Sequence, residues 1–409
     1  MSSIRALGIA FLTCLTTVSS SFTMRVAHQQ RGILTLDFDP TKPANSSIRV
    51  LSTTEAGYKP GWLHARGDKL FSISRKHFPD NTSDSAGVYS FQKMPGGQIS
   101  FIDSKSSHGD GGVYVDISPD GKTLASANID GSTVSVFPLS PDGYIGEATH
   151  VFKYNLTHPG PGTGDSQQIA NPHEAVFSPH GDLLAVPDRG SDRVYLYQVH
   201  STGQVELIRN MTLALGTGPR HILFSPLSRT KNLMYLVSEI DNTINVFSLD
   251  HPSLSCGNYR SDLNETLKIT HLQVVSTLNS SDQRTKPQNI DLASEIALSN
   301  DGRFLYVSNR NTESLDDIDT LAIYAVAAND PQPLRFLGLN STHGKIPRHF
   351  SLSSDPRNGF IAVANQVTND LHIMERDTKS GFLGRIAGQV SFGDVDLSTQ
   401  LGPMAVIWD

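Results

Sequence analysis

Residues 295–309 read EIALSNDGRFLYVSN, a short apolar strand followed by a polar turn and a second apolar strand that ends in asparagine. The same plan recurs at 114–128, 173–188, 221–239 and 349–365, and a degenerate version occupies 62–74. Most copies are followed by a third segment in which apolar and polar residues alternate, such as DRVYLYQV (192–199). Alternation with a period of two behind a turn is typical of a sheet whose bulky residues share one face. The repeat therefore predicts a series of small β-sheets.

These units are too small to bury separate cores, so we expect neighbouring units to share one. Four-stranded units of this length favour a β-propeller, whose closed ring protects the sheet edges. The chain ends supply the remaining strands, because GILTLDFD (32–39) resembles an outer strand and GPMAVIW (402–408) resembles an inner one. We expect these two segments to pair and complete a seventh blade. The sequence thus predicts an all-β fold, one seven-bladed propeller over residues 22–409.

The composition narrows the functional classes. A hydrophobic fraction of 38%, with 33 Gly and 22 Pro in 409 residues, indicates a globular, turn-rich β protein. The formal charge of −7 and the isoelectric point near 6.1 give no reason to expect a nucleic-acid partner. Beyond the amino terminus, no run is long and apolar enough to span a bilayer. We expect a monomer.

The amino terminus has the pattern of an export signal. Arg5 precedes the apolar run 6–15, and small residues follow at 16–21. A short basic region, an apolar region and a small-residue cleavage zone are typical of a signal peptide, here residues 1–21. The alternative is a buried first strand or helix.

Potential glycosylation sites agree with export. Asn-X-Ser/Thr tripeptides without proline occur in connectors at seven positions: Asn45, Asn81, Asn155, Asn210, Asn264, Asn279 and Asn340. Loss of Cys14 with the signal would leave Cys256 as the single cysteine, so no intramolecular disulfide is possible. We expect a secreted glycoprotein, in the extracellular space or the cell wall, that stays folded by burial alone.

Polar residues stand where the predicted blades meet the central channel. The first strand of each blade lines the channel, and its entry positions hold His173, Arg220, Glu295 and Arg348. The exits of the second strands hold Asp188, Glu239, Arg310 and Gln366. Arginine presents a planar fork that suits carboxylates and phosphates, so the channel is expected to bind a small anion. The alternative is structural: these residues cap strands and pair with each other.

The segment GTGPRHILFSP (216–226) places Arg220 and His221 side by side at a strand entry. Neighbouring residues on a strand face opposite sides. We therefore expect Arg220 to line the channel and His221 to point away into the packing between blades.

Several of these segments together carry a family resemblance. NPHEAVFSPHGDLLAVPDRGSDRVYLY, GTGPRHILFSP, SEIDNTINVF, EIALSNDGRFLYVSNR and IPRHFSLSS are similar to the seven-bladed-propeller lactonase family. That family includes bacterial 6-phosphogluconolactonases and fungal 3-carboxy-cis,cis-muconate cyclases. The resemblance implies a site made of His173, Arg220, Glu239 and Arg310, all of which are present. Two positions depart from many relatives, which have histidines where this chain has Tyr114 and Asn171.

This residue set supports chemistry without a metal or a cofactor. In lactone hydrolysis, Glu239 or His173 would act as general base on water, while Arg220 and Arg310 stabilise the oxyanion. In the cyclase direction, the arginines, with Arg348 as a further substrate-binding residue, would clamp two carboxylates so that one adds across a double bond. His173 or Glu239 would supply the proton. Converging arginines would repel a cation, so we expect no metal.

Two functional classes remain open from the sequence. One is a secreted lactonase or muconate-cyclase-like enzyme that acts on an extracellular aromatic-derived or sugar lactone. The other is a non-catalytic extracellular or cell-surface glycoprotein that keeps the propeller for binding. The presence of all four residues implied by the resemblance favours the enzyme.

Overall fold

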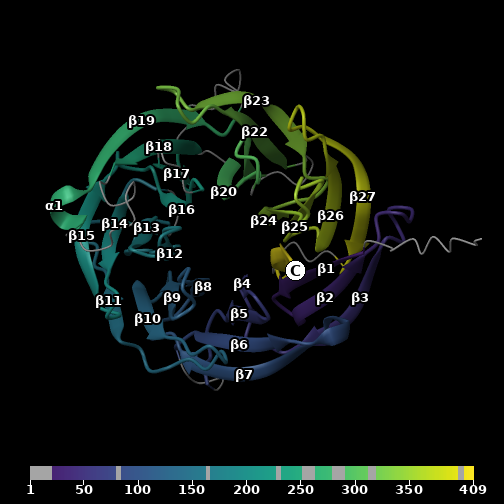
Figure 1. Cartoon of the computed structure of the whole chain (residues 1–409), viewed down its shortest axis with the longest axis horizontal. Coiled ribbons are helices and arrows are strands. Elements are labelled where there is room, and N and C mark those ends of the chain that lie inside the picture. Colours follow the sequence, from purple (N-terminus) through teal and green to yellow (C-terminus); the bar gives the residue numbers. More distant parts are fainter. Residues whose placement is uncertain are drawn as a thin grey trace, which may run out of the picture.

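The computed structural model describes residues 21–79, 84–162, 166–226, 232–250, 263–278, 291–311, 319–394 and 400–409. The described strands form seven four-stranded antiparallel sheets around a central axis (Figure 1). Each sheet runs from an inner strand beside the axis to an outer strand at the rim. The prediction of an all-β, seven-bladed propeller is confirmed.

The blades follow one another along the chain and are numbered from the first complete one. Blade 1 contains β4 (Trp62–Arg66), β5 (Lys69–Ile73), β6 (Gly87–Lys93) and β7 (Ile99–Ser106). Blade 2 contains β8 (Gly112–Ile117), β9 (Thr123–Asn128), β10 (Thr133–Pro138) and β11 (His150–Lys153). Blade 3 contains β12 (Val176–Phe177), β13 (Leu183–Asp188), β14 (Arg193–Val199) and β15 (Val205–Thr212).

The remaining blades complete the ring. Blade 4 contains β16 (Pro219–Phe224), β17 (Asn232–Ser238), β18 (Thr243–Asp250) and β19 (Lys268–Ser276). Blade 5 contains β20 (Asp291–Leu298), β21 (Phe304–Asn311), β22 (Thr320–Val326) and β23 (Leu334–Ser341). Blade 6 contains β24 (Pro347–Leu352), β25 (Phe360–Asn365), β26 (Asp370–Arg376) and β27 (Leu383–Ser391).

Blade 7 is built from both ends of the described chain, but not by the predicted pairing. Its order is β28 (Pro403–Trp408), β1 (Phe22–His28), β2 (Gly32–Phe38) and β3 (Ile48–Thr54). The inner strand β28 pairs with β1, and the segment expected to pair with it, β2, is one strand further out. The prediction of this direct pairing is wrong because β1 inserts between the two segments and pairs with both. Met24 and Val26 are fully buried there, which explains why β1 belongs to the fold.

The polar turn of the repeat closes the inner hairpin of several blades. In blade 2, Ser118 Oγ accepts a hydrogen bond from the Thr123 amide (3.0 Å) and donates one to Asp120 Oδ1 (2.7 Å). Gly121 supplies the positive φ of 77° that the turn needs. In blade 5 the same bonds join Ser299 to the Phe304 amide and to Asp301. The repeated Ser, Asp and Gly are therefore turn residues.

The opposite end of the inner strands carries β-bulges. The register of the inner hairpin shifts between Gly112 and Tyr114, between Pro219 and His221, between Ala293 and Ile296, and between Pro347 and His349. A bulge inserts an extra residue and breaks the alternation of side chains along the strand. Two neighbouring residues can then face the same side.

Apolar side chains fill the spaces between blades. Within the described chain, seven clusters of buried apolar residues each combine two neighbouring blades. Leu196 of blade 3 and Leu236 of blade 4, for example, share one cluster and are fully buried. The expectation of a core shared between units is thus met.

Helix is nearly absent from the described residues. It comprises the short helix α1 (Leu263–Thr266) and one 3₁₀ turn, η1 (Pro95–Gly97). None of the described helical segments approaches the length and apolar character that crossing a bilayer requires. Residues 1–20 of the predicted signal, which include Cys14, lie outside the described residues, and so does Cys256.

Candidate active site

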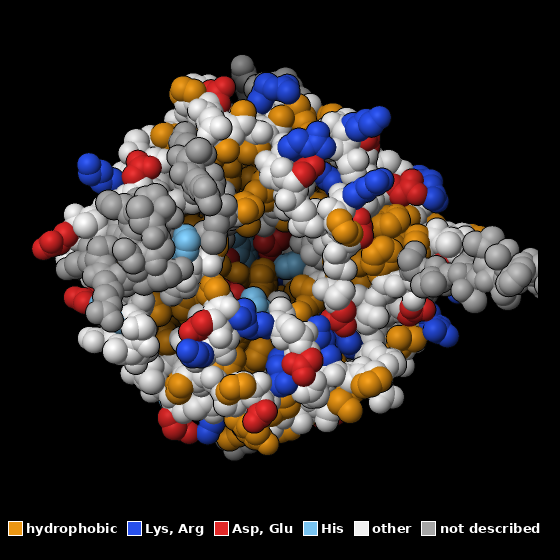
Figure 2. All heavy atoms as spheres, in the orientation of Figure 1, with side chains coloured by type: hydrophobic (Ala, Val, Ile, Leu, Met, Phe, Trp, Pro, Cys, Tyr) orange, Lys and Arg blue, Asp and Glu red, His pale blue; other side chains and the backbone are white. Residues whose placement is uncertain are grey.

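The channel end that carries the bulges is the charged end. Because the strands of a blade are antiparallel, the inner strand begins at the end where the second strand finishes. Arg220, at the start of β16, therefore meets Glu239, directly after β17. Figure 2 shows a hollow at the centre of one face of the propeller, with acidic and histidine side chains on its wall.

Three guanidinium groups converge on the Glu239 carboxylate. Arg220 Nε donates to Glu239 Oε2 and Arg189 Nη1 donates to Oε1, both at 2.7 Å. Arg310 Nη2 lies 3.2 Å from Oε2. These residues come from blades 3, 4 and 5, so the packing of three consecutive blades brings them together. We call these four residues, with Arg348 of blade 6, the arginine cluster.

Positive charge is in excess in this cluster. Burial opposes ionisation of Glu239, but the surrounding guanidinium groups outweigh it and hold its pKa well below the ordinary value. Burial lowers the pKa of Arg220 to about 10, and the charge of Arg310 adds to that effect. Arg348 has its pKa lowered well below the ordinary value, first by burial and then by neighbouring arginines. Four guanidinium groups face one ionised carboxylate, and buried charge without a counter-ion is costly.

Backbone carbonyls hold two of these arginines in place. Arg220 Nη1 donates to the Ser294 carbonyl in the bulge of β20, at 2.9 Å. Arg310 Nε and Nη2 approach the carbonyls of Leu292 and Ala293 at 3.3 and 3.4 Å. Both guanidinium groups are buried, and their fork geometry is set before any ligand binds.

A cluster of rings lies beside the arginines at the axis. Its members lie within the first three residues of different inner strands or, for His173, three residues before one: Trp62, Tyr114, His173, His221 and His349. The His221 ring is stacked on Trp62 with centroids 5.3 Å apart, and it meets His173 edge-on at 5.0 Å. We call this set the axial ring cluster.

The expected direction of His221 is wrong. Its side chain does not point into the packing between blades but contacts rings from blades 1, 2 and 3 at the axis. The reason is the bulge between Pro219 and His221, which lets Arg220 and His221 face the channel together. The same bulge precedes His349 in blade 6.

Two buried glutamates accompany the rings. Glu174 Oε1 lies 3.1 Å from His221 Nδ1, and its other oxygen accepts the Ile222 amide. Glu295 Oε1 accepts the Ile296 amide at 3.0 Å, while Oε2 lies 4.0 Å from His221 Nε2 and 3.8 Å from His349 Nε2. Within the described part of the chain, no hydrogen-bond partner reaches His173 Nδ1, His221 Nε2 or Glu295 Oε2.

Other residues predicted to face the channel have structural contacts. Asp188 is fully buried, and its Oδ1 accepts the amides of Asn171, Gly190 and Ser191. Gln366 Nε2 donates to the Gln400 carbonyl at 2.7 Å. For these two positions the structural alternative is supported.

The two positions that depart from the family pattern are both buried. Tyr114 belongs to the axial ring cluster and is hydrogen-bonded to Glu174. Asn171 Nδ2 donates to the Ile129 carbonyl at 3.1 Å. Among the described residues, no three His, Cys, Asp or Glu side chains form a group that could hold a metal ion.

The predicted glycosylation acceptors differ in accessibility. Asn45, Asn155, Asn210 and Asn264 are exposed. Asn340 is half-buried, and its Oδ1 accepts the Leu383 amide at 3.0 Å. Asn81 and Asn279 lie outside the described residues.

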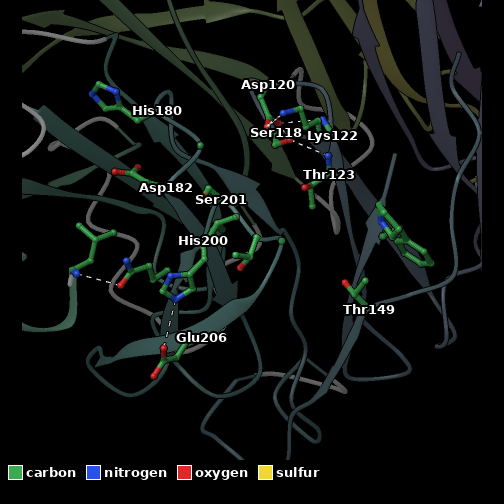
Figure 3. A pocket seen from close by; sticks show the side chains of 18 residues that line it. Ser118, Asp120, Lys122, Thr123, Thr149, His180, Asp182, His200, Ser201 and Glu206 are labelled. Atoms are coloured by element: carbon green, nitrogen blue, oxygen red, sulfur yellow. Dashed lines mark hydrogen bonds and ion pairs between the residues drawn. The ribbon is translucent and has the colours of Figure 1, made fainter. Parts of the chain in front are cut away.

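A separate pocket of about 840 Å³ lies between blades 2 and 3, away from the arginine cluster. Its lining includes the turn after β8 and the turn after β14, so it opens at the opposite ends of the inner strands. In Figure 3 the labelled side chains include Lys122, His180 and Asp182, and His200 is paired with Glu206. None of the predicted catalytic or substrate-binding residues lines it.

The comparison with protein families agrees with this geometry. The family model described as "Lactonase, 7-bladed beta-propeller" matches residues 14–395. The chain belongs to this lactonase family. Among its relatives, the 6-phosphogluconolactonase of Bacillus subtilis is 28% identical over 88% of this chain and 91% of that protein. A probable 6-phosphogluconolactonase of Arthroderma benhamiae is 26% identical over 87% and 82% of the two chains.

Solved structures support the fold of this lactonase-family chain. The periplasmic gluconolactonase of Pseudomonas aeruginosa superimposes with a TM-score of 0.75 at 26% identity, covering 95% of this chain and 99% of that one. A putative 6-phosphogluconolactonase of Bacteroides fragilis gives the same TM-score at 24% identity, with coverages of 96% and 99%.

Sequence reasoning missed several residues of the lactonase-family channel. Arg189 was overlooked although it directly follows Asp188 at a predicted strand exit. His221 and His349 had a detectable signal, because the triplet Pro-Arg-His occurs at both strand entries. Trp62 and Glu174 had no comparable signal, since their roles depend on rings and amides contributed by other blades.

Proposed function

We propose that this protein hydrolyses a small lactone that carries a negatively charged group. The observation that carries the proposal is the arginine cluster, in which three guanidinium groups contact one carboxylate at the charged end of the channel and a fourth, that of Arg348, lies near them. A bound anion would offset the excess charge, and arginine forks suit carboxylate and phosphate groups. The names of the Bacillus subtilis and Pseudomonas aeruginosa relatives support lactone hydrolysis.

The choice between the two candidate bases falls on His173. Both oxygens of Glu239 are bound by guanidinium groups, so this residue orients the arginines and is a poor proton acceptor. His173 is neutral because burial, with the charge of Arg220, holds its pKa well below the ordinary value. Its Nδ1 is free of described partners and can accept a proton from water.

The reaction then follows from the positions of these groups. The water oxygen adds to the lactone carbonyl carbon while its proton passes to His173. Arg220 and Arg310 stabilise the oxyanion that develops on the carbonyl oxygen, and their backbone contacts pre-organise them for it. Arg348, half-buried beside them, binds the anionic group of the substrate.

A pH-stat screen of purified protein tests this function. It compares a phosphorylated sugar lactone with its unphosphorylated counterpart, and muconolactones with carboxymuconate. We expect net acid release from the anionic lactone and a kcat/KM well above that of the neutral one. No turnover of any lactone would contradict the proposal, and conversion of carboxymuconate alone would assign the cyclase reaction instead.

We also propose that the protein is exported and glycosylated. The exposed Asn45, Asn155, Asn210 and Asn264 support this, as does the description of a Pseudomonas aeruginosa relative as periplasmic. Native protein should begin near residues 20–24 and lose mass on treatment with an N-glycosidase. An intact Met1 on secreted material, or an unchanged mass, would contradict export with glycosylation.

A further inference from the structure

The residues described so far leave one step of lactone hydrolysis without a proton donor. When the ring C–O bond breaks, the ring oxygen leaves with the bonding electron pair and needs a proton. His173 removes a proton from water, and the arginines remain charged throughout. An acid that is still protonated near neutral pH, and that lies beside the arginine cluster, would complete the site.

Glu295 occupies such a position. It belongs to the bulge of β20, whose preceding residue, Ser294, accepts Arg220 Nη1 and donates to the Arg348 carbonyl at 2.8 Å. The Glu295 side chain is only 9% exposed, and no described group bonds its Oε2. This oxygen faces His221 Nε2 and His349 Nε2 at distances that are too long for direct hydrogen bonds.

We propose that Glu295 is the general acid of this site and that its Oε2 protonates the ring oxygen of the lactone. The assignment rests on the proposed lactone hydrolysis. It is independent of the residues implied by the family resemblance, which do not include Glu295.

The protons and electrons balance in this scheme. Water gives its oxygen to the carbonyl carbon and a proton to His173. The ring oxygen keeps the electrons of the broken C–O bond and takes the proton of Glu295, which yields a hydroxy acid that releases its carboxyl proton to solvent. His173 then loses its proton to solvent, and Glu295 takes one up from solvent, which restores both groups.

His221 packs against both proposed proton-transfer groups. Its ring lies between His173, at a centroid distance of 5.0 Å, and Glu295 Oε2, which is 4.0 Å from Nε2. Glu174 holds the other side of the ring through Nδ1. His221 is thus a positioning residue for Glu295.

The surroundings of Glu295 favour its protonated form. Burial raises its pKa to about 8, against the opposing charges of Arg220 and Arg348. The titratable and charged groups that face it are Arg220, Arg348, His221, His349, Glu174 and Tyr114. Both histidines have lowered pKa values, chiefly through burial, and so are neutral near pH 7.

A leaving-group comparison tests the acid role. Glu295→Gln keeps the size of the side chain but has no acidic proton. We expect kcat for an anionic lactone with an aliphatic ring oxygen to fall about 100-fold. A matched lactone with a phenolic ring oxygen needs little protonation and should lose less than about 10-fold. Equal losses on both substrates would overturn the acid role.

Two further variants separate chemistry from folding. Glu295→Asp keeps an acid on a shorter chain and should recover part of the activity lost in Glu295→Gln. The exposed Glu147→Gln, whose side chain pairs with Lys105, is the matched control and should behave like wild type. An Asp variant no better than the Gln variant, with both still unfolding cooperatively, would overturn the proposal.

The pH dependence supplies an independent measurement. Wild-type kcat should fall above about pH 8, where the acid loses its proton, and Glu295→Gln should lack this decline. The unfolded chain ionises Glu295 near its ordinary pKa of about 4.3, so the stability of wild type falls as pH rises from about 4 to about 8. Glu295→Gln should therefore gain melting temperature relative to wild type across this window. A constant difference would contradict the raised pKa.

The experiments distinguish failure of the proposed function from failure of the acid role of Glu295. Wild-type protein without turnover of any lactone would overturn both the proposed function and the acid role. Wild-type turnover with a fully active Glu295→Gln would overturn the acid role alone.

Discussion

The two ends of the inner strands differ in what they repeat. At one end, successive blades use the same Ser and Asp turn, with the same hydrogen bonds in blades 2 and 5. At the other end, the residues at the bulges are Tyr114, Arg220, Glu295 and Arg348, and of these four bulges only those of blades 4 and 6 share a motif, Pro-Arg-His. The Ser and Asp residues of the turns stabilise the hairpins, and the residues at the bulges form the candidate active site.

A single strand shows both behaviours. In β20 and the turn after it, Glu295 and Ser299 are four positions apart, and both are buried. Ser299 bonds its own turn, whereas Glu295 has an oxygen directed at histidines from blades 4 and 6. Substitutions at the two ends should therefore affect different properties, which gives a direct way to test the comparison.

The largest expected effect comes from removing an inner strand altogether. Deleting residues 400–409 removes β28, exposes the edge of β1 at the axis and breaks the Arg25–Asp409 ion pair (2.7 Å). We expect the truncated chain to lose cooperative thermal unfolding, as measured by circular dichroism. A truncated chain that melts like the full-length protein would contradict the closure of blade 7 by β28.

A substitution at the charged end should affect turnover far more than folding. Arg220→Ala removes the fork that contacts Glu239, which keeps its contacts with Arg189 and Arg310. We expect kcat/KM to fall about 100-fold, or about 3 kcal/mol, with a nearly unchanged melting temperature. Arg220→Lys keeps the charge without the fork and should lose less.

Two outcomes would revise the role of Arg220. Full activity of Arg220→Ala in initial-rate assays would remove it from the site. Unfolding of the variant would make it a structural residue, and the contrast between the two ends would then fail at this position.

Anion binding should stabilise the charged end specifically. Inorganic phosphate at about 100 times its Kd would stabilise the folded protein by about 2.7 kcal/mol, seen as a higher melting temperature. Chloride at equal ionic strength serves as the control. Arg348→Ala should reduce the shift, since it removes one of the excess charges. An equal shift in the variant would place the anion elsewhere.

The smallest expected effect is at the repeating end. Ser299→Ala removes the hydroxyl that bonds the Phe304 amide and Asp301, so the free energy of unfolding should fall by about 1 kcal/mol. Turnover per folded molecule should not change. A large loss of turnover at an unchanged melting temperature would contradict the purely structural role of this end of the inner strands.

Much of the fold was predictable because the repeat is local. A turn of Ser, Asp and Gly between two apolar strands forms its hydrogen bonds within a few residues, so each copy in the sequence indicates a hairpin. The pairing in blade 7 was not predictable from the repeat, since β1 has no turn motif and lies next to the presumed signal. Only in the folded ring, where the residues of β1 are buried, can they be recognised as a strand.

The candidate site was predictable only in part. Arg220, Glu239 and Arg310 were found because each stands at a strand end, and the structure brings them onto one carboxylate. The orientation of His221 was missed, because strict alternation holds only where a strand has no bulge. Arg189 was missed because it lies one residue beyond the position considered.

The amino-acid sequence by itself determined the number of blades, the hairpin turns and the polar residues at the strand ends, since these depend on local patterns. The tertiary structure alone decided which of those residues meet and which proton each holds. Glu295 and His221 belong to neighbouring blades and come within 4.0 Å only when those blades pack together. Burial in that ring, which no local pattern specifies, raises the pKa of Glu295 and lowers that of His221.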